Sequence, residues 1–188
     1  MADVEGEVIE EETTDPEREA RRRLALSQIR QYPDAALRLH AKPVERFDEP
    51  LQQLVSRMKV LMHDASGVGL AATQVGVVKR LFVFQLEEGD DRALVNPAIV
   101  ERSDETETSD EGCLSLQGVL VPVERPTSVV ITGQDESGAD VRLELDGQPA
   151  RIVQHELDHL DGVLIVDRTT TEARREAMSI LRPRIVLR

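Results

Sequence analysis

Two histidines placed one helical turn apart constrain this chain more than any other feature. The stretch "QHELDHLDGVLI", residues 154–165, holds His155 and His159 four positions apart, with Glu156 beside the first. On a helix, positions i and i+4 share one face about 6 Å apart, so both imidazoles can bind one metal ion. The pair supplies only two protein ligands, and a third ligand has to come from elsewhere in the chain.

The glutamate in this pattern suggests hydrolytic chemistry. Glu156 lies about 100° around the helix from His155, within reach of a metal-bound water that it does not itself displace. A carboxylate there can take a proton from the acidified water and later deliver it to a leaving group. HExxH is typical of zinc peptidases, which stay an alternative, as does a solvated helix or a non-catalytic, metal-stabilised binding module.

Several residues compete for the role of third ligand. The spacing of one peptidase class would place that ligand at Ile165, which cannot bind a metal. Glu172 and Glu176 are the acidic candidates further along, in a charged segment where surface partners are their simpler role. Cys113 in "EGCLSL" would give two imidazoles, one thiolate and an open position for water. An isolated cysteine is more often a small buried apolar residue, so the residues alone leave the question open.

A third stretch, "GVGLAATQVG" at residues 67–76, is glycine-rich, apolar and nearly uncharged. Gly67 and Gly69 permit close backbone approach, and Gln74 is the only side-chain amide within it. A helix end followed by a buried strand would explain Gly67 alone. The spacing matches no nucleotide-binding loop.

Taken in order, "GVGLAATQ", "EGCLS" and "QHELDH" match the three motifs of peptide deformylase, and the chain resembles that family from about Tyr32 to Asp167. The resemblance implies a hydrolase of protein biosynthesis that removes the formyl group from the N-terminal formyl-methionine of nascent chains. It implies metal ligands at Cys113, His155 and His159. The ion would be Fe²⁺ in the cell, with Ni²⁺, Co²⁺ or Zn²⁺ able to replace it.

The resemblance also assigns the remaining roles. Water activated by the metal attacks the formyl carbon, with Glu156 as general base and then general acid. Gln74 and the backbone N–H of Leu114 hold the developing oxyanion. Gly69 pairs with the peptide backbone, and Val68 and Leu114 line the methionine pocket.

One departure from the family pattern concerns the peptide beyond methionine. The family usually has Pro and Arg where this chain has Gln117 and Leu120. We therefore expect weak discrimination past the first substrate residue. Arg125 is retained and is expected to form a supporting salt bridge with Glu111.

The rest of the chain predicts a single α+β domain, with small antiparallel sheets packed around the helix that carries HExxH. Apolar residues at period 3.6 predict an amphipathic helix over 49–64, with Asp48 as N-cap. Further helices are expected over 18–29, 148–160 and 171–181. Strands are expected over 80–87, 93–101, 118–124, 127–133, 141–147 and 162–167, and a polar loop over 102–112.

Charge and composition divide the chain into three regions. Residues 1–20 form an acidic extension expected to be disordered, since residues 1–17 contain eight acids and no Lys or Arg. Residues 21–170 form the deformylase-like domain. Residues 171–188 form a basic tail that could contact ribosomal RNA electrostatically.

Other function classes are disfavoured by simple observations. Aromatic residues make up 2% of the chain, which argues against stacking on nucleic-acid bases, and no DNA partner is expected. A start without an apolar run, the absence of a membrane-length apolar segment and a single cysteine favour the cytoplasm.

Overall fold

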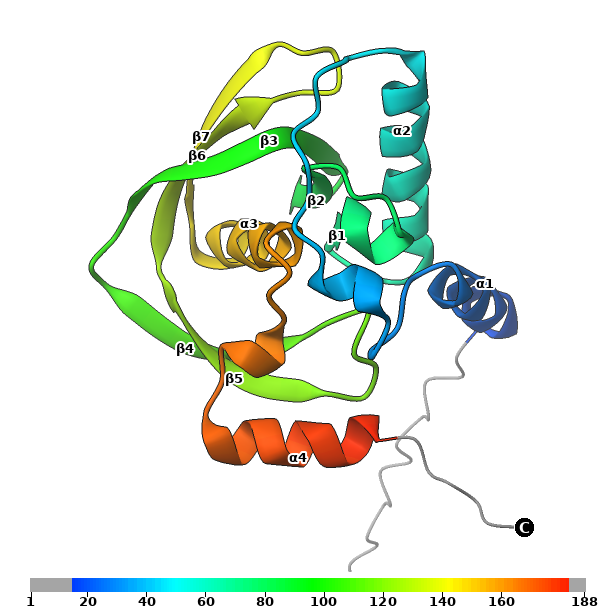
Figure 1. The fold of residues 1–188 in the computed structure, drawn as a ribbon, viewed down its shortest axis with the longest axis vertical. Helices are drawn as coiled ribbons and strands as arrows, with labels where there is room; N and C mark the ends of the chain where they lie inside the picture. The colour runs from blue at the N-terminus through cyan, green and yellow to red at the C-terminus, as the bar shows by residue number, and fades with distance from the viewer. Residues whose placement is uncertain (1–14, 183–188) are drawn as a thin grey trace, which may run out of the picture.

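The computed structural model describes residues 15–182 (Figure 1). Its helices and 3₁₀ turns are α1 (Pro16–Ser27), η1 (Ala35–Arg38), α2 (Glu49–Asp64), η2 (Ala72–Val75), α3 (Gly147–Leu160), η3 (Ile165–Asp167) and α4 (Thr171–Leu181). Its strands are β1 (Gly69–Ala71), β2 (Leu81–Glu87), β3 (Asp90–Arg102), β4 (Thr106–Gly112), β5 (Leu120–Pro126), β6 (Ser128–Gln134) and β7 (Asp140–Asp146).

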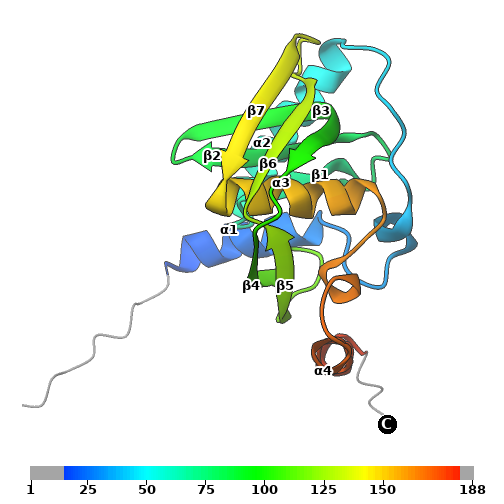
Figure 2. The ribbon, with the colours of Figure 1, turned by 90° about the vertical axis from the view of Figure 1, so that its left-hand side faces the viewer.

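The strands form two antiparallel sheets around one central helix. Five strands pair in the order β1-β2-β3-β6-β7, and β4 pairs with β5 alone. In both views α3 lies in the middle, with the large sheet on one side and β4–β5 on the other (Figures 1 and 2). The predicted single α+β domain around the HExxH helix is confirmed.

Helix α2 shows how local sequence sets an element. The Asp48 carboxylate accepts a hydrogen bond from the N–H of Leu51 at 3.3 Å, which caps the first turn, and Pro50 occupies a position where no N–H is needed. The apolar stripe then faces the core against α1, β1 and β2. Its buried members are Leu51, Val55, Met58, Leu61 and Met62.

Helix α3 is buried on nearly all sides, which is unusual for a helix rich in polar residues. Its apolar residues pack on the large sheet, among them Ala150, Val153 and Leu160. Its polar residues face inward as well and must find partners there. A helix of this kind holds its polar groups in fixed positions away from bulk water.

The expected loop over 102–112 is wrong for most of its length. Residues 106–112 form β4, which pairs with β5 from Thr106 opposite Pro126 to Gly112 opposite Leu120. Most of its side chains are exposed, whereas Glu111 is buried. Apart from Glu111, the polar residues of this segment are exposed to solvent. The segment is a strand because its backbone pairs with β5, which its composition does not indicate.

Two further expectations need correction. The predicted strand over 162–167 contains the turn η3, because the Asp167 carboxylate accepts a hydrogen bond from the N–H of Leu164 at 2.9 Å and closes it. Helix α1 begins at Pro16, with Asp15 as its cap, so residues 16–20 of the segment expected to be disordered are helical. Residues 1–14 and 183–188 lie outside the described part.

Within residues 15–182, none of the helices combines the length and the apolar character that crossing a bilayer requires.

Candidate active site

Three side chains from two elements converge beside the central helix. Cys113 directly follows β4, and His155 and His159 lie on one face of α3. The Sγ of Cys113 is 3.2 Å from Nε2 of His159, which is 3.2 Å from Nε2 of His155. All three ligand atoms lie within 4.8 Å of one another. Ligands around a tetrahedral metal are separated by about 3.3–3.6 Å, so the three atoms could hold one ion with a fourth position free.

Glu111 fixes the orientation of one of these histidines. Its Oε2 is 3.0 Å from Nδ1 of His155, which leaves Nε2 facing the other two ligand atoms. The carboxylate also accepts hydrogen bonds from Arg125 at 2.6 and 2.9 Å and from Arg151 at 2.8 Å. Burial alone would raise the pKa of Glu111, but the bonds from Arg125 and His155 outweigh it and hold that pKa well below its usual range.

Glu156 follows His155 directly in α3 and is 4% exposed. Burial raises the pKa of its carboxyl to about 7. Its Oε2 is buried and has no hydrogen-bond partner within residues 15–182. A carboxylate with a free oxygen and a pKa near neutrality can exchange protons with a water or substrate that enters the site.

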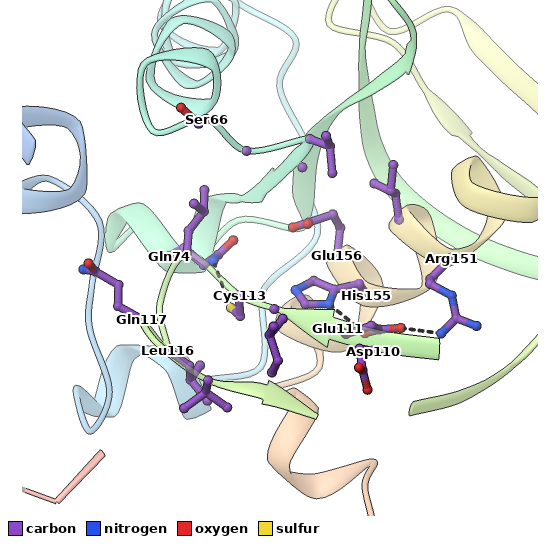
Figure 3. A pocket seen from close by; sticks show the side chains of 18 of the residues that line it. Ser66, Gln74, Asp110, Glu111, Cys113, Leu116, Gln117, Arg151, His155 and Glu156 are labelled. Atoms are coloured by element: carbon purple, nitrogen blue, oxygen red, sulfur yellow. Dashed lines mark hydrogen bonds and ion pairs between the residues drawn. The ribbon is translucent and has the colours of Figure 1, made fainter. Parts of the chain in front are cut away.

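Gln74 is held in place at both ends of its amide. Its Oε1 accepts a bond from the N–H of Ala71 at 2.8 Å, and its Nε2 donates to Oγ of Ser115 at 3.0 Å. The same Nε2 is 3.7 Å from Sγ of Cys113, and Figure 3 shows the side chain pointing toward that sulfur. The amide is therefore a fixed donor at the edge of the site.

Gln74, Cys113, His155 and Glu156 line a cavity of about 660 Å³, large enough for a peptide side chain and neighbouring backbone (Figure 3). Val68, Gly69 and Leu114 line it beside Cys113 and Glu156. A Cβ on Gly69 would lie 2.8 Å from Cδ of Glu156, so this glycine lets β1 pass directly over the carboxylate. A Cβ on Gly67 would lie 2.7 Å from Cδ1 of Leu114, so the segment that leads into β1 passes equally close to that side chain.

The other candidate ligands lie elsewhere. Ile165 is 3% exposed in the apolar cluster formed with β5 and α4. Glu172 and Glu176 are exposed on α4, which packs on the far side of β5 (Figure 1). Among the described residues, only Cys113 joins the two histidines in a cluster of potential ligands.

Two arginines of this region escaped the sequence analysis. Arg151 sits on α3 within bonding distance of Glu111, and Arg22 of α1 lines the cavity. The sequence does contain a signal for Arg151, because it is a charged residue on the otherwise apolar face of the helix expected over 148–160. Nothing in the local pattern distinguished Arg22 from its neighbouring arginines.

Comparison with known proteins gives a consistent result. The sequence model of the polypeptide deformylase family matches residues 26–175. Peptide deformylase of Caldicellulosiruptor bescii is 50% identical over 145 residues, 77% of this chain and 86% of that protein. The Thermotoga neapolitana peptide deformylase is 48% identical over 140 residues, 74% of this chain and 85% of that protein.

Solved structures agree with the sequence relatives. The crystal structure of a peptide deformylase from Legionella pneumophila superposes with a TM-score of 0.78 and 40% identity, covering 81% of this chain and 91% of that one. The range matched by the family model contains all three motif segments. The chain therefore belongs to the polypeptide deformylase family, enzymes that remove the formyl group from the N-terminus of nascent peptides.

Proposed function

We propose that Cys113, His155 and His159 hold the metal of this deformylase and that Glu156 moves the protons of the reaction. The observation that carries the proposal is the meeting of three ligand atoms beside a buried carboxylate with a free oxygen. Each group alone has a structural explanation. Their convergence in one cavity has the composition of a hydrolytic site.

The donor set fits a divalent transition metal. When bound, such an ion acidifies water and polarises the formyl carbonyl. Two imidazoles and a thiolate accept Fe²⁺, Ni²⁺, Co²⁺ and Zn²⁺, and availability decides among them. We propose Fe²⁺ as the ion used in the cell.

Glu156 has the placement and the proton affinity for two successive transfers. It takes a proton from the attacking water as oxygen adds to the formyl carbon. It then gives that proton to the amine nitrogen as the carbon–nitrogen bond breaks. The products are formate and a free methionine amino terminus. A pKa of about 7 suits both transfers at neutral pH.

Gln74 and the backbone N–H of Leu114 are proposed to donate to the formyl oxygen as its negative charge grows. The bonds of Gln74 to Ala71 and Ser115 keep its amide oriented before substrate arrives. A fixed donor of this kind contributes about 3–4 kcal/mol to transition-state stabilisation, because it needs no reorganisation during the reaction.

Strand β1 is proposed to hold the peptide backbone. Among residues 15–182, β1 lies at the edge of the large sheet and pairs with β2 alone, so its other edge can accept an extended peptide. Gly69 would bond to the backbone, while Val68 and Leu114 contact the methionine side chain. Val68 is 46% exposed in the free protein, which is consistent with an apolar contact that substrate covers.

The test is formate release from formyl-Met-Ala-Ser by anaerobically purified protein with measured metal content. Glu156→Gln should retain the metal and lose turnover by about 10³-fold or more, because proton transfer is lost while the ligands stay. Cys113→Ala should lose both the metal and the turnover. A Cys113→Ala protein that keeps its metal and its rate would overturn the ligand assignment.

We also propose that the basic C-terminal region contacts the ribosome and that the enzyme acts in the cytoplasm, where nascent chains emerge. Residues 168–188 carry six Arg against two Glu, and Arg175 is exposed on α4. Binding to ribosomal RNA would weaken steeply as salt rises. Salt-insensitive binding, or binding unchanged when the chain is cut after Arg168, would contradict it.

A further inference from the structure

The N-terminal helix contributes a wall of the cavity from outside the matched family region. α1 begins at Pro16, whereas the family match begins at residue 26. The helix is fixed to the body of the protein by Ala25, Leu26 and Ile29, which are buried in the cluster around α2 and β1. Leu26 also lines the cavity. Most of α1 is therefore an addition to the family domain that reaches its active site.

Arg22 is the residue of α1 that faces this cavity. It lies one turn before Leu26, on the same face of the helix, and lines the cavity with it. Its neighbours Arg21 and Arg23 are exposed, whereas Arg22 is half-buried. Arg22 is thus a partly buried residue of the cavity wall.

Arg22 combines partial burial with the lack of a partner among residues 15–182. Arg23 lies 3.8 Å from Glu19, and Arg151 bonds to Glu111 and to the carbonyl oxygens of Val123 and Glu107. Within residues 15–182, no hydrogen bond or ion pair is made by Arg22. A half-buried cation that has lost part of its hydration gains more from an arriving anion than a fully solvated one.

The path of the substrate leads toward this arginine. Gly69 lies against Glu156 and marks the end where the formyl group reacts. From there the backbone runs back through Ser66, which also lines the cavity, to Ala65, which belongs to the same core cluster as Leu26. A peptide laid along this segment with its formyl end at Glu156 carries its following residues toward α1.

We infer that Arg22 is a specificity-determining residue that binds an acidic side chain at the second or third position of the formylated substrate. The inference rests on the proposed function of the site and names its preferred substrates, nascent chains that begin formyl-Met followed by Asp or Glu. The departures at Gln117 and Leu120 predict the opposite, weak discrimination past the first residue. The same substrate comparison tests both predictions.

The experiment compares peptides based on formyl-Met-Ala-Ser-amide that carry Glu, Gln or Lys at the second or the third position. The C-terminal amide removes a carboxylate that could occupy Arg22 by itself. We expect kcat/KM for Glu to exceed that for Lys by about five- to tenfold at one of the two positions, mainly through KM. The ratio should fall as salt rises from 50 to 500 mM, because the ion pair is partly exposed.

Variants of the arginines separate charge recognition from folding. Arg22→Ala should bring the Glu-to-Lys ratio close to one, and Arg22→Glu should invert it, which a loss of stability cannot do. Arg21→Ala, an exposed change on the same helix, should keep the wild-type ratio. Equal ratios in wild type and Arg22→Ala would overturn the role of Arg22. A wild-type protein that releases formate from none of the peptides would instead refute the proposed function.

Discussion

At the scale of single residues, the candidate active site depends on Glu111, a carboxylate that is neither a proposed metal ligand nor the proposed general base. Glu111 joins Arg125, Arg151 and His155, and all four side chains are largely buried. The bonds from Arg125 and His155 keep Glu111 ionised, and the carboxylate orients His155. The salt bridge between Glu111 and Arg125 that the sequence predicted is part of this larger group.

Replacing Glu111 with Gln should destabilise the protein by about 3–5 kcal/mol, because buried Arg151 loses its counter-charge and buried Arg125 keeps only its pair with Asp158. Metal affinity should fall by about 10- to 100-fold as His155 loses its orientation. Urea unfolding and metal titration measure the two effects. The matched control is Glu101→Gln, which breaks an exposed pair with Arg142 and should cost less than about 1 kcal/mol. Equal losses of unfolding free energy in Glu111→Gln and Glu101→Gln would show that the buried charges around Glu111 contribute no more than an exposed pair.

At the scale of elements, a short strand passes directly over the Glu156 carboxylate. β1 has only three residues, and the next turn, η2, carries Gln74. Pairing with β2 sets the distance between Gly69 and α3. The backbone of β1 can pass this close to Glu156 only at a glycine, because any side chain at this position would collide with the carboxylate.

A Gly69→Ala change should therefore lower kcat/KM by about 100-fold or more, because the new methyl group displaces the Glu156 carboxylate from its reactive position. The thermal midpoint and metal content should change little, since the backbone of this strand is extended and the ligands are untouched. Formate release, calorimetry and metal analysis on one preparation test this. Full activity in the variant would mean that the carboxylate tolerates a shift.

Elements also show where sequence patterns lose their predictive value. Helices α2 and α4 have the predicted bounds because caps and apolar periodicity are local. β4 was missed because its hydrogen bonds go to β5, and its exposed side chains resemble those of a loop.

At the scale of the whole molecule, Asp167 ties the two ends of the domain together. Its carboxylate is bonded by Arg38 of η1 and by the N–H of Leu164, and lies 3.6 Å from Arg174 of α4. Partial burial would raise the pKa of Asp167, but the bonds from Arg38 and Leu164 outweigh it and lower that pKa. Stability from this contact is complete above the unfolded-state pKa of about 3.9 and is lost as pH falls through the lower folded value.

Asp167→Asn should cost about 1 kcal/mol of unfolding free energy at pH 6. The difference from wild type should shrink as pH falls below about 4, because the wild-type carboxyl then becomes neutral as well. Urea unfolding at pH 6, 4 and 3 measures it. A difference independent of pH would mean that the charge of Asp167 contributes nothing.

By itself, the sequence determined the helix that carries His155, Glu156 and His159, the α+β class and, through three motifs, the family. These depend on local spacing, which a helix or a motif converts directly into position. The tertiary structure decided what depends on contacts between distant residues. It brought Cys113 to the histidines, paired polar β4 with β5, surrounded Glu111 with arginines and placed Arg22 of α1 at the cavity wall. No local pattern encodes these contacts, because each one joins residues that are far apart in the sequence and meet only when the chain folds.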